Sequence, residues 1–509
     1  MKKVFSFILI AVFVFPVYAQ KSLKKKLKEL DSFYEASLKE WEVPGMAIAI
    51  VKDDSLVFAK GYGLSEINTG KKVDANTIFP IASNTKAFTA AALGMLVEEG
   101  KLHWDDKVRE HLPWFEMYDP YVTVNMTVRD LLCHRSGLKT FAGDLLWYET
   151  TYNRREVVER ARFLEPTYGF RAHYGYSNIM YLAAGLIIEE ITGLSWDEYI
   201  RQEFLKPLNM NRAITSTNEL GNFNNVAAPH TTHDGKIIPI SYQNWDNIAP
   251  AGGIIASVND VSQWLKMQLN KGVYKNDTLL NTRTINEMWA PQTIQGVSIW
   301  TEQNFPTNFK SYGLGWALMD YHGKKVVSHG GGYDGMISQS AMVPEEELGL
   351  VVLTNKNSWL ILPVLYKTLD VFLSDQDKDW SDFYLKFWNN RIEAGKERIK
   401  KLEENRIKNT MPSLPLESYT GIYHDKMYGD AEIILKDGKL SLQLVPAPDF
   451  KGHLKHYHFD TFEIGFFNFP SLPKGLVNFD LNEKGEISSM KIDVPNPDFD
   501  FTEMKFIKK

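Results

Sequence analysis

The period of the hydrophobic pattern changes several times along the chain. Two apolar runs at residues 46–51 and 56–59 flank the polar residues 52–55, which predicts two strands joined by a tight turn. Strands are predicted again from about residue 312 to residue 355. Between these regions, apolar residues recur at helical spacing over residues 84–99, 178–192 and 258–269. Because strands open and close this region, we expect an α+β domain in which helices pack on an antiparallel sheet.

Two further segments follow this main domain, which we place at residues 20–373. Residues 374–411 are rich in charged side chains and carry apolar residues at helical spacing, which predicts a helical connector. Residues 412–509 contain short alternating runs separated by glycine, proline, asparagine and aspartate. This pattern predicts a small all-β, barrel-like domain at the end of the chain.

Residues 1–19 have the pattern of a secretory signal peptide. Lys2 and Lys3 precede an almost unbroken apolar run over residues 4–17, and Ala19 ends a cleavage motif of small residues. An N-terminal membrane anchor is the alternative interpretation, but the run is shorter than the ~20 apolar residues that span a bilayer. We therefore expect an exported protein, periplasmic or secreted, with no stable membrane anchor after cleavage.

The composition excludes several classes of protein. The 509 residues include 57 Lys and Arg against 63 Asp and Glu, a net charge of -6, which gives no sign of the basic face that nucleic acid needs. A nucleic-acid partner is therefore not expected. The single cysteine, Cys133, excludes a disulfide-stapled fold and is interpreted as a small buried residue rather than a reactive thiol. Composition leaves the oligomeric state open.

A Ser-X-X-Lys tetrapeptide stands at the predicted start of the first helix. One helical turn separates Ser83 from Lys86, so the amine can reach the hydroxyl and act as its base. The same spacing occurs elsewhere in the chain at positions that begin no long apolar helix. An N-cap serine followed by a solvent-facing lysine is the alternative interpretation.

Two other segments carry candidate chemistry. Tyr176 and Asn178 lie in a turn-rich loop directly before an apolar helix, and catalytic side chains commonly sit on such loops. His329 is followed by three consecutive glycines, which let a substrate approach the backbone and expose amide groups to an oxyanion. A tight turn that needs positive φ is the alternative interpretation of these glycines.

Six short motifs, called landmarks below, occur one after another along residues 38–356. They are Val43-Pro-Gly-Met-Ala, Phe79-Pro-Ile-Ala-Ser, Leu131-Leu-Cys-His-Arg-Ser-Gly-Leu, Tyr176-Ser-Asn-Ile-Met-Tyr-Leu, Pro250-Ala-Gly-Gly-Ile-Ile-Ala-Ser and Tyr312-Gly-Leu-Gly-Trp. In these landmarks the sequence resembles the serine β-lactamase and penicillin-binding-protein-like hydrolases, in the class C-like branch with DD-peptidases, D-aminopeptidases and esterases. The resemblance implies a β-lactamase/transpeptidase-like fold, an antiparallel sheet flanked by helices with an inserted helical region. The region from about Leu416 resembles the small β module appended to some members.

The resemblance also implies a role for each candidate residue. Ser83 would be the acylated nucleophile, and Lys86 would accept its proton. Tyr176 would pass a proton to the leaving group, while Asn178 would hydrogen-bond the substrate's amide. The main-chain amides of Ser83 and Gly332 would form the oxyanion hole. This chemistry requires no metal or organic cofactor.

The third motif departs from the family's most common pattern. Typical β-lactamases and DD-peptidases have lysine-threonine-glycine where this chain has His329 and Gly330. That lysine supplies a permanent charge for a substrate carboxylate, whereas an imidazole with a pKa of about 6.5 is mostly neutral near pH 7. His329 and Gly331 would still contact the substrate. Because a histidine here occurs in esterase-like and aminopeptidase-like members, the departure disfavours efficient β-lactam hydrolysis.

Three functions follow from these patterns. We expect an exported serine hydrolase that cleaves an ester or amide of a small molecule or peptide, such as one with D-amino acids or one related to the cell wall. A β-lactamase or DD-carboxypeptidase is the alternative among enzymes. A catalytically inactive cell-wall or ligand-binding protein on the same fold is the alternative from another class.

The remaining histidines are interpreted as structural. His453, His456 and His458 lie close together in the β module, but no cysteine or carboxylate accompanies them in a ligand pattern. A surface cluster is therefore favoured over a metal pair, and no metal site is expected. His134, in the third landmark, is expected to support the fold rather than take part in catalysis.

Overall fold

The computed structural model describes residues 5–509 of the chain, with side chains from Ser22 onward. The first helix, α1, spans Phe5–Glu40. The signal segment expected at residues 1–19 lies outside the residues whose side chains are described. Its cleavage therefore stays a prediction.

The main domain is built on an antiparallel sheet of eight strands, in the order β2-β1-β14-β13-β12-β11-β10-β9. The strands are β1 (Gly45–Lys52), β2 (Ser55–Gly63), β9 (Thr293–Gln295), β10 (Lys310–Tyr312), β11 (Ala317–Tyr321), β12 (Lys324–Tyr333), β13 (Met336–Val343) and β14 (Leu348–Thr354). The two ends of the domain meet where β1 pairs with β14. The expected α+β arrangement, with one sheet made from both ends of the domain, is confirmed.

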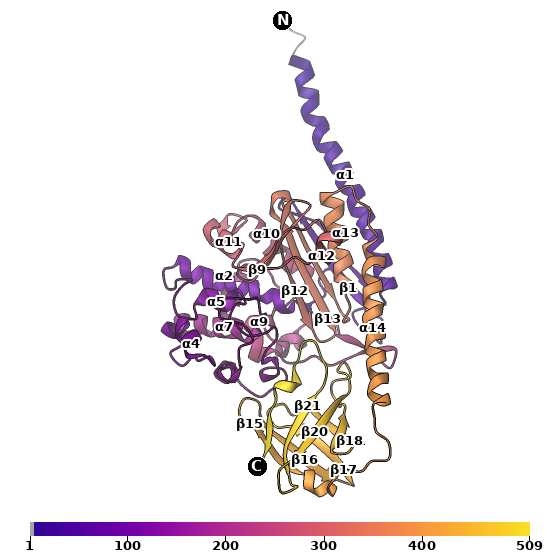
Figure 1. The fold of residues 1–509 in the computed structure, drawn as a ribbon. Coiled ribbons are helices and arrows are strands. Elements are labelled where there is room, and N and C mark those ends of the chain that lie inside the picture. Colours follow the sequence, from indigo (N-terminus) through magenta and orange to yellow (C-terminus); the bar gives the residue numbers. More distant parts are fainter. Residues whose placement is uncertain (1–4) are drawn as a thin grey trace.

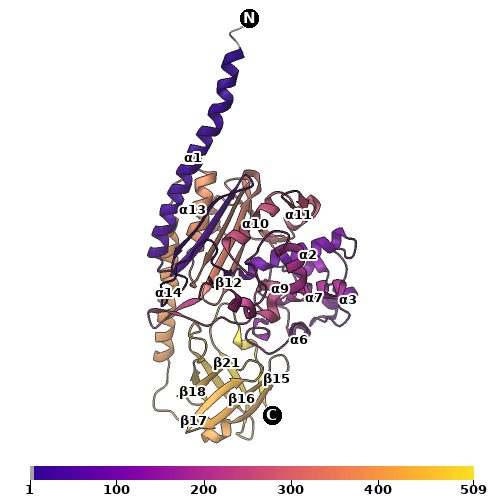
Figure 2. The same cartoon turned by 180° about the vertical axis from the view of Figure 1, so that it is seen from behind.

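Strand β1 shows that both faces of this sheet are buried. Ala47 and Ala49 join one hydrophobic core, whereas the alternate residues Ile48 and Ile50 join another. Such a continuous apolar strand needs cover on both sides. Helices α2 (Thr85–Glu98), α7 (Asn178–Thr192) and α10 (Val258–Leu269) belong to the first layer, and α1, α13 (Ile361–Leu373) and α14 (Trp380–Glu404) to the second. Figures 1 and 2 show the two layers on opposite sides of the sheet.

The helical layer follows the expected periodicity closely. Helices α7 and α10 have the bounds that the sequence pattern predicts. Gly193 ends α7 with a left-handed φ of 71°, the usual conformation of a glycine after a helix. The shorter helices are α3 (Val108–His111), α4 (Pro120–Asn125), α5 (Val128–Leu132), α6 (Arg154–Arg160), α8 (Trp196–Ile200), α9 (Ala249–Gly252), α11 (Thr282–Met288) and α12 (Ile299–Asn304). Short strand pairs join β3 (Phe79–Pro80) to β6 (Ile255–Ala256), β4 (His230–His233) to β5 (Lys236–Pro239), and β7 (Val273–Tyr274) to β8 (Asp277–Thr278).

Within the part of the chain whose side chains the structure describes, from Ser22 onward, no single helix is long and apolar enough to cross a membrane. By length and composition alone, α7 and the segment Trp196–Leu205 pass together as a pair bent by 81°.

A closed barrel of eight strands follows α14. Its strands are β15 (Gly421–Asp425), β16 (Gly429–Lys436), β17 (Lys439–Leu444), β18 (Lys451–His458), β19 (Thr461–Ile464), β20 (Gly475–Leu481), β21 (Ile487–Asp493) and β22 (Phe506–Lys508). The expected all-β domain is confirmed. Strand β18 has a weak apolar signal, because lysines and histidines alternate with its few buried residues. His453 and His456 of this strand hydrogen-bond to Ser441 and to the carbonyl of Phe459.

The barrel packs directly against the main domain (Figure 1). Residues of both domains belong to one continuous hydrophobic core. The N–H of Thr151 donates to the carbonyl of Pro446 at 2.8 Å, and the N–H of Gly143 donates to Glu503 Oε2 at 3.0 Å. The two domains therefore share a specific polar and apolar interface.

Candidate active site

Ser83 lies where a short strand turns into a helix. Strand β3 leads into the single turn η1 (Ala82–Asn84), from which α2 continues. Ala82 has a φ of 45°, a left-handed conformation that is uncommon for a residue with a side chain. Such strain is often found where a fold presents a functional group. The turn leaves Ser83 partly exposed at the edge of the core.

Strand β12 approaches this turn closely. A Cβ on Gly331 would lie 2.4 Å from the carbonyl oxygen of Ile81 and 3.0 Å from the Ala82 side chain. Only glycine allows such an approach. The three glycines belong to β12, and none of them has positive φ, so the tight-turn interpretation is excluded.

Lys86 lies buried beneath Ser83. Its Nζ is 3.1 Å from Ser83 Oγ, and it donates to Asn178 Oδ1 at 2.7 Å and to the carbonyl of Ala251 at 2.9 Å. Burial lowers the pKa of Lys86 to about 7, although the Asp144 charge opposes this shift. A neutral lysine can keep two donated hydrogen bonds and offer its lone pair to the serine hydroxyl. Lys86 is thus placed to act as a general base at neutral pH.

The ring of Tyr176 contacts the same lysine. Lys86 Nζ is 4.8 Å from the centroid of the Tyr176 ring. Burial raises the pKa of Tyr176 well above its ordinary value, and a hydrogen bond with Ser83 only partly opposes the shift. The phenol therefore keeps its proton at neutral pH. It is suited to donate a proton, while Lys86 is suited to accept one.

His134 supports the Tyr176 loop from within the core. The two rings have centroids 4.2 Å apart, and His134 Nδ1 accepts a hydrogen bond from the N–H of Ser177 at 3.0 Å. Burial lowers the pKa of His134 well below its ordinary value, with Lys86 adding to the shift. The neutral, buried imidazole therefore supports the Tyr176 loop from inside the core.

Asn178 connects the lysine to a carboxyl group that the sequence patterns did not single out. Its Oδ1 accepts from Lys86, and its Nδ2 donates to Asp144 Oδ2 at 2.7 Å. Asp144 lies 34 residues away from Asn178 along the chain. Because an isolated loop aspartate has no periodicity or spacing of its own, local sequence reasoning had no signal for it.

His329 faces the cleft from β12 as a neutral group. Its Nδ1 lies 2.6 Å from the carbonyl oxygen of Gly330, and its Nε2 lies 2.8 Å from the hydroxyl of Tyr312. Because a carbonyl can only accept, Nδ1 carries the proton and Nε2 accepts from Tyr312. Burial lowers the pKa of His329 to about 3, and the neighbouring Lys86 adds to the shift. This position therefore offers no positive charge to a carboxylate at neutral pH.

These groups open onto a cleft of about 440 Å³. Of the residues singled out in the sequence, the cleft is lined by Ser83, Tyr176, Asn178, His329 and Gly332. Lys86 lies behind this surface. Gly331 packs against Ile81 instead, so it is not placed to contact a substrate in the cleft.

The walls of the cleft come from three parts of the chain. Aromatic side chains dominate them, namely Phe141, Trp147, Tyr176, Trp245, Tyr333, Trp359, Trp388 and Phe499. Trp388 and Arg391 belong to α14, and Asp498 and Phe499 belong to a loop of the barrel. Local patterns could not assign these four residues to the site, because only the folded chain brings α14 and the barrel to it.

A family model described as Beta-lactamase matches residues 30–361 of the chain. The chain belongs to the beta-lactamase family. The match spans the sheet, the helical layer and the candidate residues Ser83, Lys86, Tyr176, Asn178 and His329, whereas the cleft residues of α14 and the barrel lie beyond it. A second model, described as a domain of unknown function (DUF3471), matches residues 405–508, which contain the barrel. The resemblance noted in the sequence is confirmed, and as a member of this family the protein is a serine hydrolase in general terms.

The chain is also similar to a hydrolase and to a protein named flp. The chain is 28% identical over 426 residues to the unguisins hydrolase ungD' of Aspergillus campestris, covering 78% of this chain and 76% of the relative. It is 28% identical over 338 residues to the protein flp of Staphylococcus aureus, covering 65% and 63%.

Solved structures support the same fold. A penicillin-binding protein homologue from Pyrococcus abyssi, described as octameric, superposes with a TM-score of 0.63 at 23% identity, covering 95% of this chain and 100% of that one. SurE superposes with a TM-score of 0.55 at 18% identity, covering 96% and 100%. Both similarities extend over nearly the whole chain and concern the fold alone.

Proposed function

We propose that this member of the beta-lactamase family is an exported serine hydrolase that cleaves an ester or amide through an acyl-enzyme on Ser83. The observation that carries the proposal is the placement of Lys86 Nζ 3.1 Å from Ser83 Oγ. A serine hydroxyl is a weak nucleophile and needs a base at this distance. A lysine whose pKa is lowered to about 7 by burial is such a base.

The reaction begins when Ser83 Oγ attacks the carbonyl carbon and its proton passes to Lys86. Negative charge then develops on the carbonyl oxygen, where the N–H groups of Ser83 and Gly332 would stabilise it. As the carbonyl re-forms, the bond to the leaving group breaks, and the leaving group takes a proton through Tyr176. Water next attacks the acyl-enzyme, and the same groups transfer its proton back to Ser83.

The substrate class is inferred from the chemistry of the cleft. A neutral His329 favours esters and peptides over β-lactams, whose recognition in this family uses a cation for the carboxylate. Asn178 would hydrogen-bond the acyl side, and aromatic walls would hold an apolar group. The name of the unguisins hydrolase supports hydrolysis in general, and a SurE structure solved with D-Leu supports a peptide or ester that contains a D-amino acid.

Export is proposed from the N-terminal pattern of Lys2, Lys3 and the apolar run that ends before Ala19. A periplasmic or secreted mature protein should begin at Gln20. Mass spectrometry of the N-terminal peptide from cell fractions tests this, and an uncleaved N-terminus in the cytoplasm would contradict it.

The decisive experiment for the reaction is intact-mass analysis after exposure to a fluorophosphonate, a penicillin or p-nitrophenyl acetate, with Ser83→Ala as the control. Adducts with the fluorophosphonate or ester that vanish in Ser83→Ala support the proposal. A stable penicillin adduct indicates a DD-carboxypeptidase, and rapid penicillin turnover indicates a β-lactamase. A folded protein without any adduct would instead be a binding protein on this fold.

A further inference from the structure

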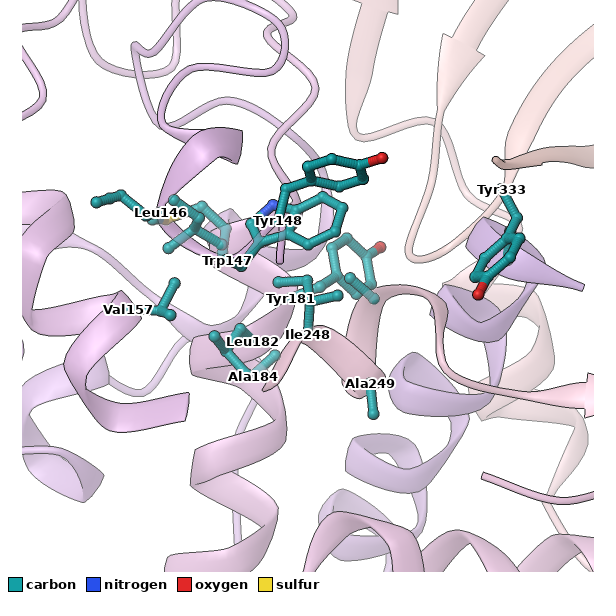
Figure 3. Close-up of a cluster of buried hydrophobic side chains, with 14 of the residues drawn as sticks. Leu146, Trp147, Tyr148, Val157, Tyr181, Leu182, Ala184, Ile248, Ala249 and Tyr333 are labelled. Atoms are coloured by element: carbon teal, nitrogen blue, oxygen red, sulfur yellow. The ribbon is translucent and has the colours of Figure 1, made fainter. Parts of the chain in front are cut away.

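Asp144 is a buried carboxyl group beside the proposed catalytic residues. It begins the turn η2 (Asp144–Leu146), and only 3% of its surface is exposed. The residues that follow it anchor this turn: Leu146 and Trp147 share one hydrophobic core with Leu182 of α7 (Figure 3). Asp144 is therefore held in place by packing on a helix that also carries Asn178.

Both carboxylate oxygens of Asp144 accept a hydrogen bond. Trp147 Nε1 donates to Oδ1 at 2.9 Å, and Asn178 Nδ2 donates to Oδ2 at 2.7 Å. An ionised carboxylate can only accept, so it binds the NH₂ end of the Asn178 amide. The other end, Oδ1, must then face Lys86. A reversed amide would set NH₂ against the lysine amine and oxygen against the carboxylate.

The charge of Asp144 also acts on Lys86. Burial raises the pKa of Asp144, with Asp498 adding to the shift, whereas the hydrogen bonds from Trp147 and Asn178 and the charge of Lys86 oppose it and favour the ionised form. In turn, the Asp144 charge raises the pKa of Lys86 against burial. The other titratable groups that respond to Asp144 are Tyr176 and Tyr428, which keep their protons because burial raises their pKa well above the ordinary value.

We infer that Asp144 is a positioning residue of this enzyme, which orients the Asn178 amide toward Lys86 and stabilises the ammonium formed there when Ser83 gives up its proton. The inference rests on the proposed function. In the attacking step, the Ser83 O–H bond breaks, its proton passes to Lys86, the Oγ–carbon bond forms, and the π electrons of the carbonyl move to its oxygen. The ammonium formed on Lys86 keeps its hydrogen bond to Asn178 Oδ1. Asp144 lies at the edge of the cleft, and its side chain binds Trp147 and Asn178 rather than Ser83 or Lys86, so it acts on the lysine through Asn178.

Asp144→Asn is the direct test, because it keeps the size of the side chain. Its one remaining oxygen cannot serve both Trp147 and Asn178, so the Asn178 amide loses its fixed orientation. We expect acylation by p-nitrophenyl acetate to slow by about 100-fold, the scale on which small misplacements of reacting groups act. The rising limb of kcat/KM against pH should move to lower pH, since the Lys86 ammonium loses a stabilising charge.

A double variant, Asp144→Asn with Asn178→Asp, keeps every hydrogen bond with the charge in a new place. Trp147 can donate to the oxygen at 144, the NH₂ at 144 to the carboxylate at 178, and Lys86 to that same carboxylate. This variant should regain most of the acylation rate relative to Asp144→Asn. Its rising limb should lie at higher pH than in the wild type, because the carboxylate now contacts Lys86 directly.

Asp334→Asn is the matched control for a buried carboxyl in the same cleft. Burial raises the pKa of Asp334 to about 6, but it is bound by Tyr148 and has no contact with Lys86. Its substitution should leave the midpoint of the rising limb in place. Two outcomes would overturn the inference when Ser83→Ala is inactive. One is a folded Asp144→Asn whose rate and midpoint are unchanged, and the other is a double variant that does not recover the acylation rate. A fully active Ser83→Ala would overturn the proposed function as well.

Discussion

The ring of Phe499, from the barrel, packs against the ring of Tyr148, from the main domain, with centroids 4.2 Å apart. Phe499 also lines the cleft that contains Ser83. Tyr148 continues the contact inward, because its hydroxyl donates to Asp334 at the end of β12. The barrel therefore supplies one wall of the cleft, and its loop should influence which substrates fit.

Phe499→Ala should loosen this wall. Removing a ring that is 9% exposed should lower the free energy of unfolding by about 3 kcal/mol, the usual cost of truncating a buried phenylalanine. Acylation by the small p-nitrophenyl acetate should change little, whereas KM for a larger peptide ester should rise. Thermal melts and steady-state kinetics measure these effects.

The matched control is Phe467→Ala on the same domain, since that ring is 54% exposed. It should change the free energy of unfolding by no more than about a few tenths of a kcal/mol. KM should stay unchanged. Equal effects in both variants would mean that the barrel loop has no special relation to the cleft.

The pH profile should report Lys86. Its pKa is lowered to about 7 by burial, and it must be unprotonated to accept the Ser83 proton. Acylation should therefore increase as pH rises through about 7, and Lys86→Met should reduce it by roughly 100-fold or more.

His329→Gln should leave the midpoint of this pH profile unchanged, because the pKa of His329 is lowered to about 3 and its ring is neutral throughout this range. Stopped-flow acylation over roughly two pH units on either side of the midpoint measures both effects. A midpoint that moves in His329→Gln would contradict the assignment to Lys86.

His134→Leu should destabilise the loop that carries Tyr176. The substitution removes the acceptor of the Ser177 N–H, and a buried unsatisfied donor costs about 1–3 kcal/mol. Acylation should also slow, because a branched aliphatic side chain replaces the imidazole ring that packs on Tyr176. The control is His173→Leu in the same stretch of chain, where the side chain is exposed. Thermal melts should separate the two variants, and equal stability would refute a supporting role for His134.

Sequence patterns predicted those parts of the fold whose signals are local. Ser177 caps the start of α7 and Gly193 ends it, so both bounds could be read from neighbouring residues. The same holds for the apolar strands of the sheet. Asp144 and Phe499 could not be found in this way, since a loop aspartate and a single aromatic residue carry no periodicity. Their positions depend on the docking of η2 on α7 and of the barrel on the main domain.

The glycines 330–332 show a different limit. Their spacing was compatible with a turn or with close approach to a ligand, and sequence alone could not choose. The structure places them in β12, where Gly331 makes room for Ile81 and Gly330 and Gly332 line the cleft. Alternation along a strand therefore divides three identical residues between packing and the cleft.

Gly185→Ala should disturb the site from behind. A Cβ at this position of α7 would lie 2.3 Å from Pro250 Cγ, so α9 must move, and the adjacent carbonyl of Ala251 is an acceptor for Lys86. We expect a loss of about 1–3 kcal/mol in stability, typical of overpacking, together with slower acylation because Lys86 loses its alignment. Gly395→Ala in α14 is the matched control, because nothing lies within 4 Å of its Cβ position. There the better helix propensity of alanine should raise stability by about 0.5–1 kcal/mol and leave acylation unchanged. Denaturant unfolding and p-nitrophenyl acetate kinetics on both variants test this prediction. If Gly185→Ala is as stable and as fast as Gly395→Ala, then α9 can shift without moving the Ala251 carbonyl away from Lys86.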